Sequence, residues 1–184
     1  VLNNPLNPFS IKKLKISEEL DEKLPHSSVI QAMLKKISEE KVRKHLKFLV
    51  SQKSRKIGTA GNLETVSYIE NLFKKYRYEV KRVCFKKSVC NVWGIKKGKV
   101  DEYVLIEAHL DSVGALKAGA DDNASGAAGL LEMARLLSKK DGKRGIIVFA
   151  TNGEENGLLG SKDFVKKAKK SGLLSKISFF INMD

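Results

Sequence analysis

Four segments of the sequence carry acidic residues or histidine at, or soon after, the ends of short apolar runs. These segments are His109-Leu110-Asp111, residues 119–126 with Asp121 and Asp122, Glu154-Glu155, and Asn182-Met183-Asp184. Carboxylates gathered in one place repel one another unless a cation neutralises them. Because imidazole and carboxylate are both zinc ligands, this mixture indicates a site for zinc or a similar divalent ion.

Two of these segments also offer side chains that can assist a metal ion. His109 and Asp111 lie on the same side of an extended segment, so the Asp111 carboxylate can hold the imidazole. Glu154 and Glu155 offer one carboxylate to a metal and another to a water molecule. A lone carboxylate after a strand is more often a helix cap, but recurrence at successive strand ends favours a metal site. A thiolate zinc site is not indicated, because the sequence has no Cys-x-x-Cys pair.

The elements that must position these residues alternate between apolar runs and stretches of helical periodicity. Strands are predicted at residues 78–85, 89–95, 103–106, 145–150 and 177–181. Helices are predicted within 28–51, as two short helices or one broken helix, and then at 63–76, 130–137 and the lysine-rich stretch 162–170. Asn62 is the expected N-cap of the helix at 63–76.

Strands that are apolar on both faces and alternate with helices are typical of parallel strands buried between helix layers. The first two strands form an antiparallel hairpin. The predicted fold class is therefore α/β, with a mixed, largely parallel central sheet flanked by helices. Ligands bind such sheets at the carboxyl ends of the strands, which is where the acidic segments fall.

The hairpin contains Cys84 and Cys90, which are the only cysteines. If Lys86-Lys87-Ser88 is its turn, the two cysteines lie opposite each other with their side chains on one face. They can then form a cross-strand disulfide in an exported protein, and two buried free thiols are the alternative.

Length and composition favour one domain with a short N-terminal extension. The chain has 184 residues, 42% of them hydrophobic, and all three prolines lie within the first 25 residues. Residues 1–27 are thus expected to be an arm or the remnant of a propeptide, and residues 28–184 the catalytic domain. His26 and His45 are expected to be surface or helix-packing histidines, because neither has an acidic or histidine neighbour at ligand spacing.

The formal net charge of +14 would alone suggest nucleic acid or an anionic membrane as a partner. However, residues 101–160 hold ten acidic against six basic residues, and the lysines of 162–170 are typical of a solvated helix face. Neither nucleic acid nor a membrane is therefore expected as a partner. No run is apolar enough to span a bilayer, and any export signal is expected to have been removed from a secreted or periplasmic protein.

In their order along the chain, the four acidic segments, with Gly160-Ser161 after the third, resemble the motifs of the co-catalytic zinc aminopeptidase family. This family of zinc exopeptidases is typified by secreted bacterial leucyl aminopeptidases, and the resemblance extends from about residue 42 to residue 184. It implies a phosphorylase/hydrolase-like fold, two Zn²⁺ ions and a peptide substrate with a free N-terminus.

The resemblance also implies a role for each site residue. Asp122 would bridge two zinc ions, His109 and Asp184 would complete the protein ligands of one, and Glu155 would bind the other. Asp111 would orient His109, and Glu154 would be the general base. A cis peptide bond is implied between Asp122 and the residue after it, Asn123.

The family takes a further histidine ligand from a later segment, and this sequence stops at Asp184. The 184-residue chain is therefore expected to hold at most one tightly bound zinc and to show little or no activity by itself. The alternatives are a carboxypeptidase or a glutaminyl cyclase on the same scaffold, or a binding module without metals. Glutaminyl cyclases typically have serine at the position of Asn123, which favours the aminopeptidase.

Overall fold

The computed structural model describes residues 28–86, 88–114 and 118–184. The predicted arm at 1–27, with His26, and Lys87 of the predicted turn therefore lie outside the described residues. The chain divides into two compact units, Val1–Ile37 and Ser38–Asp184. The first contains helix α2, Ser28–Leu34, and the second contains the sheet and the other helices.

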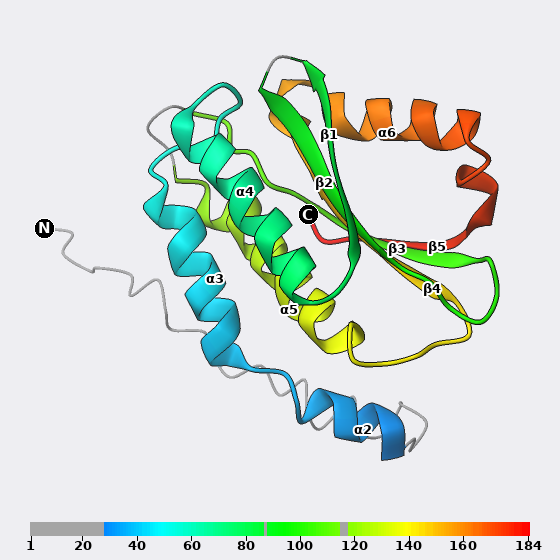
Figure 1. The fold of residues 1–184 in the computed structure, drawn as a ribbon. Helices are drawn as coiled ribbons and strands as arrows, with labels where there is room; N and C mark the ends of the chain where they lie inside the picture. The colour runs from blue at the N-terminus through cyan, green and yellow to red at the C-terminus, as the bar shows by residue number, and fades with distance from the viewer. Residues whose placement is uncertain (1–27, 87, 115–117) are drawn as a thin grey trace, which may run out of the picture. The chain divides into compact units, whose positions relative to one another are not determined.

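The second unit is built on a five-stranded sheet with the order β1-β2-β4-β3-β5 (Figure 1). Its strands are β1 Glu79–Lys86, β2 Val89–Lys96, β3 Tyr103–His109, β4 Gly145–Thr151 and β5 Ile177–Asn182. The pairs β1/β2 and β2/β4 are antiparallel, whereas β3 is parallel to both of its neighbours, β4 and β5. The predicted mixed sheet is confirmed, and the three parallel strands place their carboxyl ends at one edge.

Helices cover both faces of this sheet. They are α3 Glu39–Ser51, α4 Ala60–Lys75, α5 Gly126–Leu137 and α6 Leu159–Lys170. The connecting segments contain an irregular turn at Ala120–Ser125 and short 3-10 turns at Glu154–Asn156 and Leu174–Lys176. Figure 1 shows α4 and α5 on one face, with α3 beside α5, and α6 on the other face. No helix among the described residues is long and apolar enough to cross a bilayer.

The two faces of β3 build two separate apolar clusters. Ile106 packs toward α4 and α5 with Phe73 and Leu130, whereas Leu105 packs toward α6 with Phe164. This alternation follows from the period of two along a strand. The same alternation places His109 on the face of Leu105, at the end of the strand that runs to the site.

The predicted cap of α4 is wrong. Thr59 is the N-cap residue, and its hydroxyl accepts a hydrogen bond from the backbone N–H of Asn62 at 3.2 Å. The Asn62 side chain is fully buried and exchanges two hydrogen bonds, each 3.0 Å, with the amide of Asn152. The Asn62 side chain therefore binds a residue distant in the sequence, and Thr59 accepts the hydrogen bond from the free N–H at the start of the helix.

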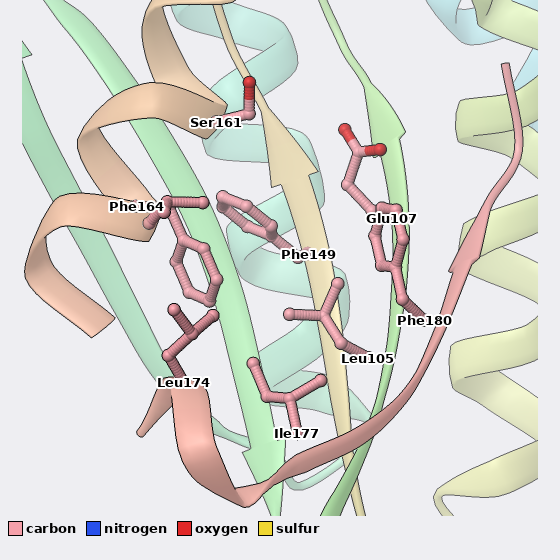
Figure 2. A pocket seen from close by; sticks show the side chains of 9 residues that line it. Leu105, Glu107, Phe149, Ser161, Phe164, Leu174, Ile177 and Phe180 are labelled. Atoms are coloured by element: carbon pink, nitrogen blue, oxygen red, sulfur yellow. The ribbon is translucent and has the colours of Figure 1, made fainter. Parts of the chain in front are cut away.

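Strand β5 is less buried than its apolar sequence predicts. It lies at the edge of the described sheet, and its Phe179 and Phe180 side chains are 62% and 57% exposed. Beside it, a cavity of about 240 Å³ opens on the α6 face (Figure 2). Its walls are apolar, and the Glu107 carboxylate lies at one end.

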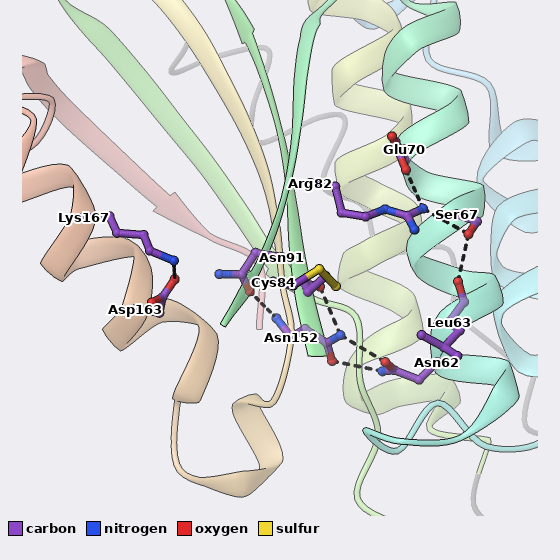
Figure 3. Close-up of a disulfide and its surroundings, with 11 residues drawn as sticks. Asn62, Leu63, Ser67, Glu70, Arg82, Cys84, Asn91, Asn152, Asp163 and Lys167 are labelled. Carbon is purple, nitrogen blue, oxygen red and sulfur yellow. Dashed lines mark hydrogen bonds and ion pairs between the residues drawn. A yellow bond between two sulfur atoms is a disulfide. The ribbon is translucent and has the colours of Figure 1, made fainter. Parts of the chain in front are cut away.

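The β1–β2 hairpin contains a disulfide between Cys84 and Cys90, which face each other across the two strands (Figure 3). Of the two predicted alternatives, the disulfide is the one present. The backbone carbonyl of Cys90 accepts a hydrogen bond from Asn152 at 3.1 Å, so the hairpin is also attached to the end of β4.

The core can be tested with two leucines that differ in exposure. Leu130→Ala, at a fully buried position, should lower the free energy of unfolding by about 2–5 kcal/mol through lost burial and the cavity left behind. Leu63→Ala, at a position 41% exposed on α4, should change it by no more than about 0.5–1 kcal/mol. Urea unfolding measures both, and equal midpoints would contradict this account of the core.

Candidate metal centre

Three of the predicted ligands come together at the carboxyl edge of the sheet. His109 ends β3, and its Nε2 lies 3.0 Å from Oδ1 of Asp122 and 3.2 Å from Oδ1 of Asp184. One ligand atom from each residue lies within 4.8 Å of the other two. The His109 side chain is 2% exposed, whereas those of Asp122 and Asp184 are 68% and 45% exposed. An imidazole nitrogen and two carboxylates, open to solvent on one side, are a donor set suited to zinc.

The charge around His109 is strongly negative. Burial lowers the pKa of His109, but the neighbouring carboxylates of Asp111, Asp184 and Glu154 outweigh it and raise that pKa to about 9. Carboxylates favour a positive charge at this nitrogen whether a proton or a metal ion supplies it. The site therefore has the electrostatic character of a cation site.

Asp111 is fully buried and serves two segments. Its Oδ1 lies 3.5 Å from Nδ1 of His109, which is an ion-pair distance and longer than an ordinary hydrogen bond. Its two carboxylate oxygens also accept hydrogen bonds from the backbone N–H groups of Glu154 and Glu155, at 3.1 and 3.2 Å. The same carboxylate thus faces the imidazole and anchors the turn that carries both glutamates.

Glu155 is not part of the three-residue cluster, although it lies near it. Burial raises the pKa of Glu155, and the negative charge of Asp122 raises it further. One of its carboxylate oxygens, Oε1, is buried and has no hydrogen-bond donor among the described residues. A buried, unpaired carboxylate oxygen close to a second carboxylate can be satisfied by a cation.

The turn that carries Asp122 is attached to the end of β5. The peptide bond between Asp122 and Asn123 is cis, which confirms the feature that the family resemblance implies. The Asn123 side chain donates to the carbonyl of Met183 at 3.0 Å and accepts from the N–H of Gly126 at 2.8 Å. Because Met183 precedes Asp184, this contact brings the two aspartates together.

Several buried polar residues near the site were not predicted from the sequence. Arg55 is fully buried, and Asn91, Asn62 and Asn152 form a connected set of hydrogen bonds behind the Glu154–Asn156 turn (Figure 3). Many of their partners are distant backbone groups, which leave no signal in a local pattern. His45 packs between helices as predicted, with Nδ1 2.6 Å from the Tyr68 hydroxyl.

The structure thus places a candidate cation site at the carboxyl edge of a helix-covered α/β sheet, which is where ligands bind sheets of this kind. Residues 91–184, which are more than half of the chain, match Peptidase family M28. The chain belongs to this family.

Two curated relatives show how far the similarity extends. Aminopeptidase YwaD of Bacillus subtilis is 39% identical over 97 residues, which cover 50% of this chain and 21% of the relative. The alkaline phosphatase isozyme conversion protein of Escherichia coli is 31% identical over 71% of this chain and 46% of its own length. The chain spans less than half of the length of each relative.

Solved structures share the fold at low sequence identity. The LapA aminopeptidase of Legionella pneumophila has a TM-score of 0.79 and 21% identity, over 87% of this chain and 45% of its own. A glutaminyl cyclase of Porphyromonas gingivalis has a TM-score of 0.70 and 21% identity, over 79% of this chain and 58% of its own. These matches confirm the predicted zinc exopeptidase fold.

The raised pKa of His109 predicts how the stability of the metal-free protein depends on pH. A histidine whose pKa rises from its usual 6.5 to about 9 on folding stabilises the folded state fully below pH 6.5. This contribution is lost as the pH rises through about 9. Melting temperatures of chelator-treated protein should therefore fall across this window, and His109→Gln should flatten the fall. A melting temperature that rises with pH in the wild type would contradict the assignment.

Two glycines on α5 test the contact between the Asp122 turn and β5. A Cβ atom at Gly126 would lie 1.9 Å from the carbonyl oxygen of Met183, whereas one at Gly129 would lie 3.8 Å from its nearest neighbour. Gly126→Ala should displace Asp184 and weaken zinc binding at least about tenfold, or about 1.4 kcal/mol. Gly129→Ala, the control, should leave zinc affinity unchanged. Titration against a chromogenic chelator measures both, and equal affinities would contradict the predicted displacement.

Proposed function

We propose that the protein is a zinc-dependent exopeptidase, and specifically an aminopeptidase that releases N-terminal residues from peptides. The observation that carries this proposal is the convergence of His109, Asp122 and Asp184 beside a turn that holds two glutamates. Membership of Peptidase family M28 supports a peptidase, and the donor set supports zinc.

The residues fit one zinc ion, and they provide part of the site for a second. His109, Asp122 and Asp184 would hold the first ion, and Asp122 with Glu155 would contribute two carboxylates to the second, for which the family resemblance implies a further histidine. The unpaired buried oxygen of Glu155 and the negative charge of Asp122 beside it support this second assignment. When bound, zinc supplies a Lewis acid that polarises the substrate carbonyl and lowers the pKa of water.

Glu154 is the general base in this proposal. Its carboxylate would accept a proton from the attacking water and then donate that proton to the amine of the departing peptide. Asp111 supports this role, because its hydrogen bond to the N–H of Glu154 fixes the turn relative to His109. The base is then held on the same rigid edge as the metal ligands, as proton transfer within hydrogen-bond reach requires.

Charge favours an aminopeptidase over a carboxypeptidase. A carboxypeptidase needs an accessible cation for the terminal carboxylate of the substrate. Among the described residues, Arg55 is a cation that interacts with Asp111 and Asp122, but it is fully buried and donates to backbone carbonyls. The carboxylates of the site are better suited to the ammonium group of a free N-terminus.

The proposal is tested with one peptide in free, N-acetylated and C-amidated forms, before and after metal removal and zinc addition. Release of the N-terminal residue is expected from the free and the amidated peptides only, and zinc should restore it. Release from the C-terminus would instead support a carboxypeptidase. Loss of ammonia from an N-terminal glutaminyl peptide would support a cyclase, and absence of both turnover and bound zinc would support a binding module.

Substitutions of the adjacent residues Glu154 and Glu155 should have different effects on catalysis and on zinc binding. Glu154→Gln removes a base but no proposed ligand, so kcat should fall by about 10²–10⁴-fold while zinc content stays at the wild-type value. Glu155→Gln should instead lower zinc affinity. Metal analysis beside steady-state kinetics separates the two, and loss of zinc in Glu154→Gln would reverse the assignment.

A further inference from the structure

Arg55 is a cation buried beneath the candidate metal centre. It has no exposed surface and is among the largest fully buried side chains of the described residues. Its guanidinium donates to the carbonyls of Leu110 and Gly119, each at 2.9 Å, to Leu49 at 3.3 Å, and to Ala118. Since burial of a charge is costly, so complete a set of partners indicates that the position demands this side chain.

The carbonyls that Arg55 binds belong to the segments that carry the candidate ligands. Leu110 lies between His109 and Asp111, and Gly119 begins the turn that leads to Asp122. One planar guanidinium therefore joins the end of β3 to the Asp122 turn. Its donors point in fixed directions along a rigid fork, and the single nitrogen of a lysine cannot reproduce that geometry.

The backbone of Arg55 is also linked by hydrogen bonds to the segment that leads into the Glu154–Asn156 turn. Its carbonyl accepts from the Asn62 side chain at 2.7 Å, and Asn62 exchanges hydrogen bonds with Asn152 (Figure 3). Asn152 is followed by Gly153 and the Glu154–Asn156 turn. Three of the four acidic segments thus meet one buried polar network, whose members are nearly or fully excluded from solvent.

Arg55 also opposes the negative charge of the site. Burial lowers the pKa of Arg55, while the carboxylates of Asp111, Asp122 and Glu155 act in the opposite direction and favour its charged form. A pure charge effect and a positioning effect predict opposite results for metal binding. Removal of a nearby positive charge should strengthen cation binding, whereas loss of the fork should weaken it.

We propose that Arg55 is a positioning residue of the metal centre. Its guanidinium fixes the distance between the His109 segment and the Asp122 turn. Its backbone carbonyl binds Asn62, which binds Asn152, and these hydrogen bonds hold the Glu154–Asn156 turn in place. The part that concerns peptide turnover rests on the proposed aminopeptidase function. The part that concerns local structure and metal binding does not require turnover.

The test uses Arg55→Lys, which keeps the charge, and Arg55→Met, which removes it at similar length. Zinc affinity, the visible spectrum of the cobalt-substituted protein, and kcat and KM are measured for each. Both variants should bind zinc at least about tenfold more weakly, change the cobalt spectrum, and lower kcat more than they change KM. Arg135→Lys is the matched control, because Arg135 is a largely buried arginine paired with Glu132 on α5. It should lower the melting temperature without changing zinc affinity or the cobalt spectrum.

Hydrogen exchange of residues 118–124 in the metal-free protein provides a readout independent of zinc and catalysis. Exchange in this segment should accelerate in both Arg55 variants and remain at the wild-type rate in Arg135→Lys. Asn62→Ala is the milder variant if the Arg55 variants do not fold, and it should also weaken zinc binding and accelerate exchange.

Wild-type zinc affinity and cobalt spectrum in Arg55→Lys, or tighter zinc binding in Arg55→Met, would overturn the positioning role. If zinc binding and hydrogen exchange respond as expected but no peptide is cleaved, the proposed function fails while this inference stands. If the wild type cleaves peptides but the Arg55 variants bind metal as the wild type does, the proposed function stands and this inference fails.

Discussion

The repulsion among carboxylates around one buried imidazole is the constraint on which the site depends. Among the described residues, six acidic side chains interact with His109 electrostatically or by direct contact, namely Glu107, Asp111, Asp122, Glu154, Glu155 and Asp184. Such a cluster persists only if donors or cations offset its charge. Backbone N–H groups do so for Asp111, the Arg55 cation lies beneath, and the open side of the cluster suits a metal ion.

The fold meets this constraint by bringing rigid backbone from distant parts of the chain to one edge. Strand β3 lies between β4 and β5 and is parallel to both, so the segments that follow these three strands must lie side by side. Hydrogen bonds across their ends, such as Leu110 N–H to the Thr151 carbonyl at 2.9 Å, keep them in register. The apolar clusters on both faces hold the sheet, and the polar network occupies the space between them at the edge.

The sequence predicted the positions of the strands and the candidate ligands at their ends, because strands and strand-end carboxylates have local signatures. Each strand was predicted to within a few residues, and His109, Asp122 and Asp184 do converge. What supports them was not predicted. The Arg55 contacts join carbonyls as far as 64 positions away, and Asn62 pairs with a residue 90 positions away. Local rules therefore predicted Asn62 as the N-cap of α4, whereas Thr59 is the N-cap residue. They also predicted that β5 is buried, whereas this strand lies at the edge of the described sheet.

Exposure divides the residues of the site into two groups, and this division follows from what each group must do. Asp122 and Asp184 are 68% and 45% exposed at their side chains, as suits candidate ligands for an ion that enters from solvent. His109, Asp111 and Arg55 are almost or fully buried, where the weaker screening of charges makes each interaction stronger and each position more restricted. The buried group sets the geometry that the exposed group presents. A substitution in the buried group should therefore alter the site without changing a candidate carboxylate ligand, because Asp122 and Asp184 both contact the buried His109.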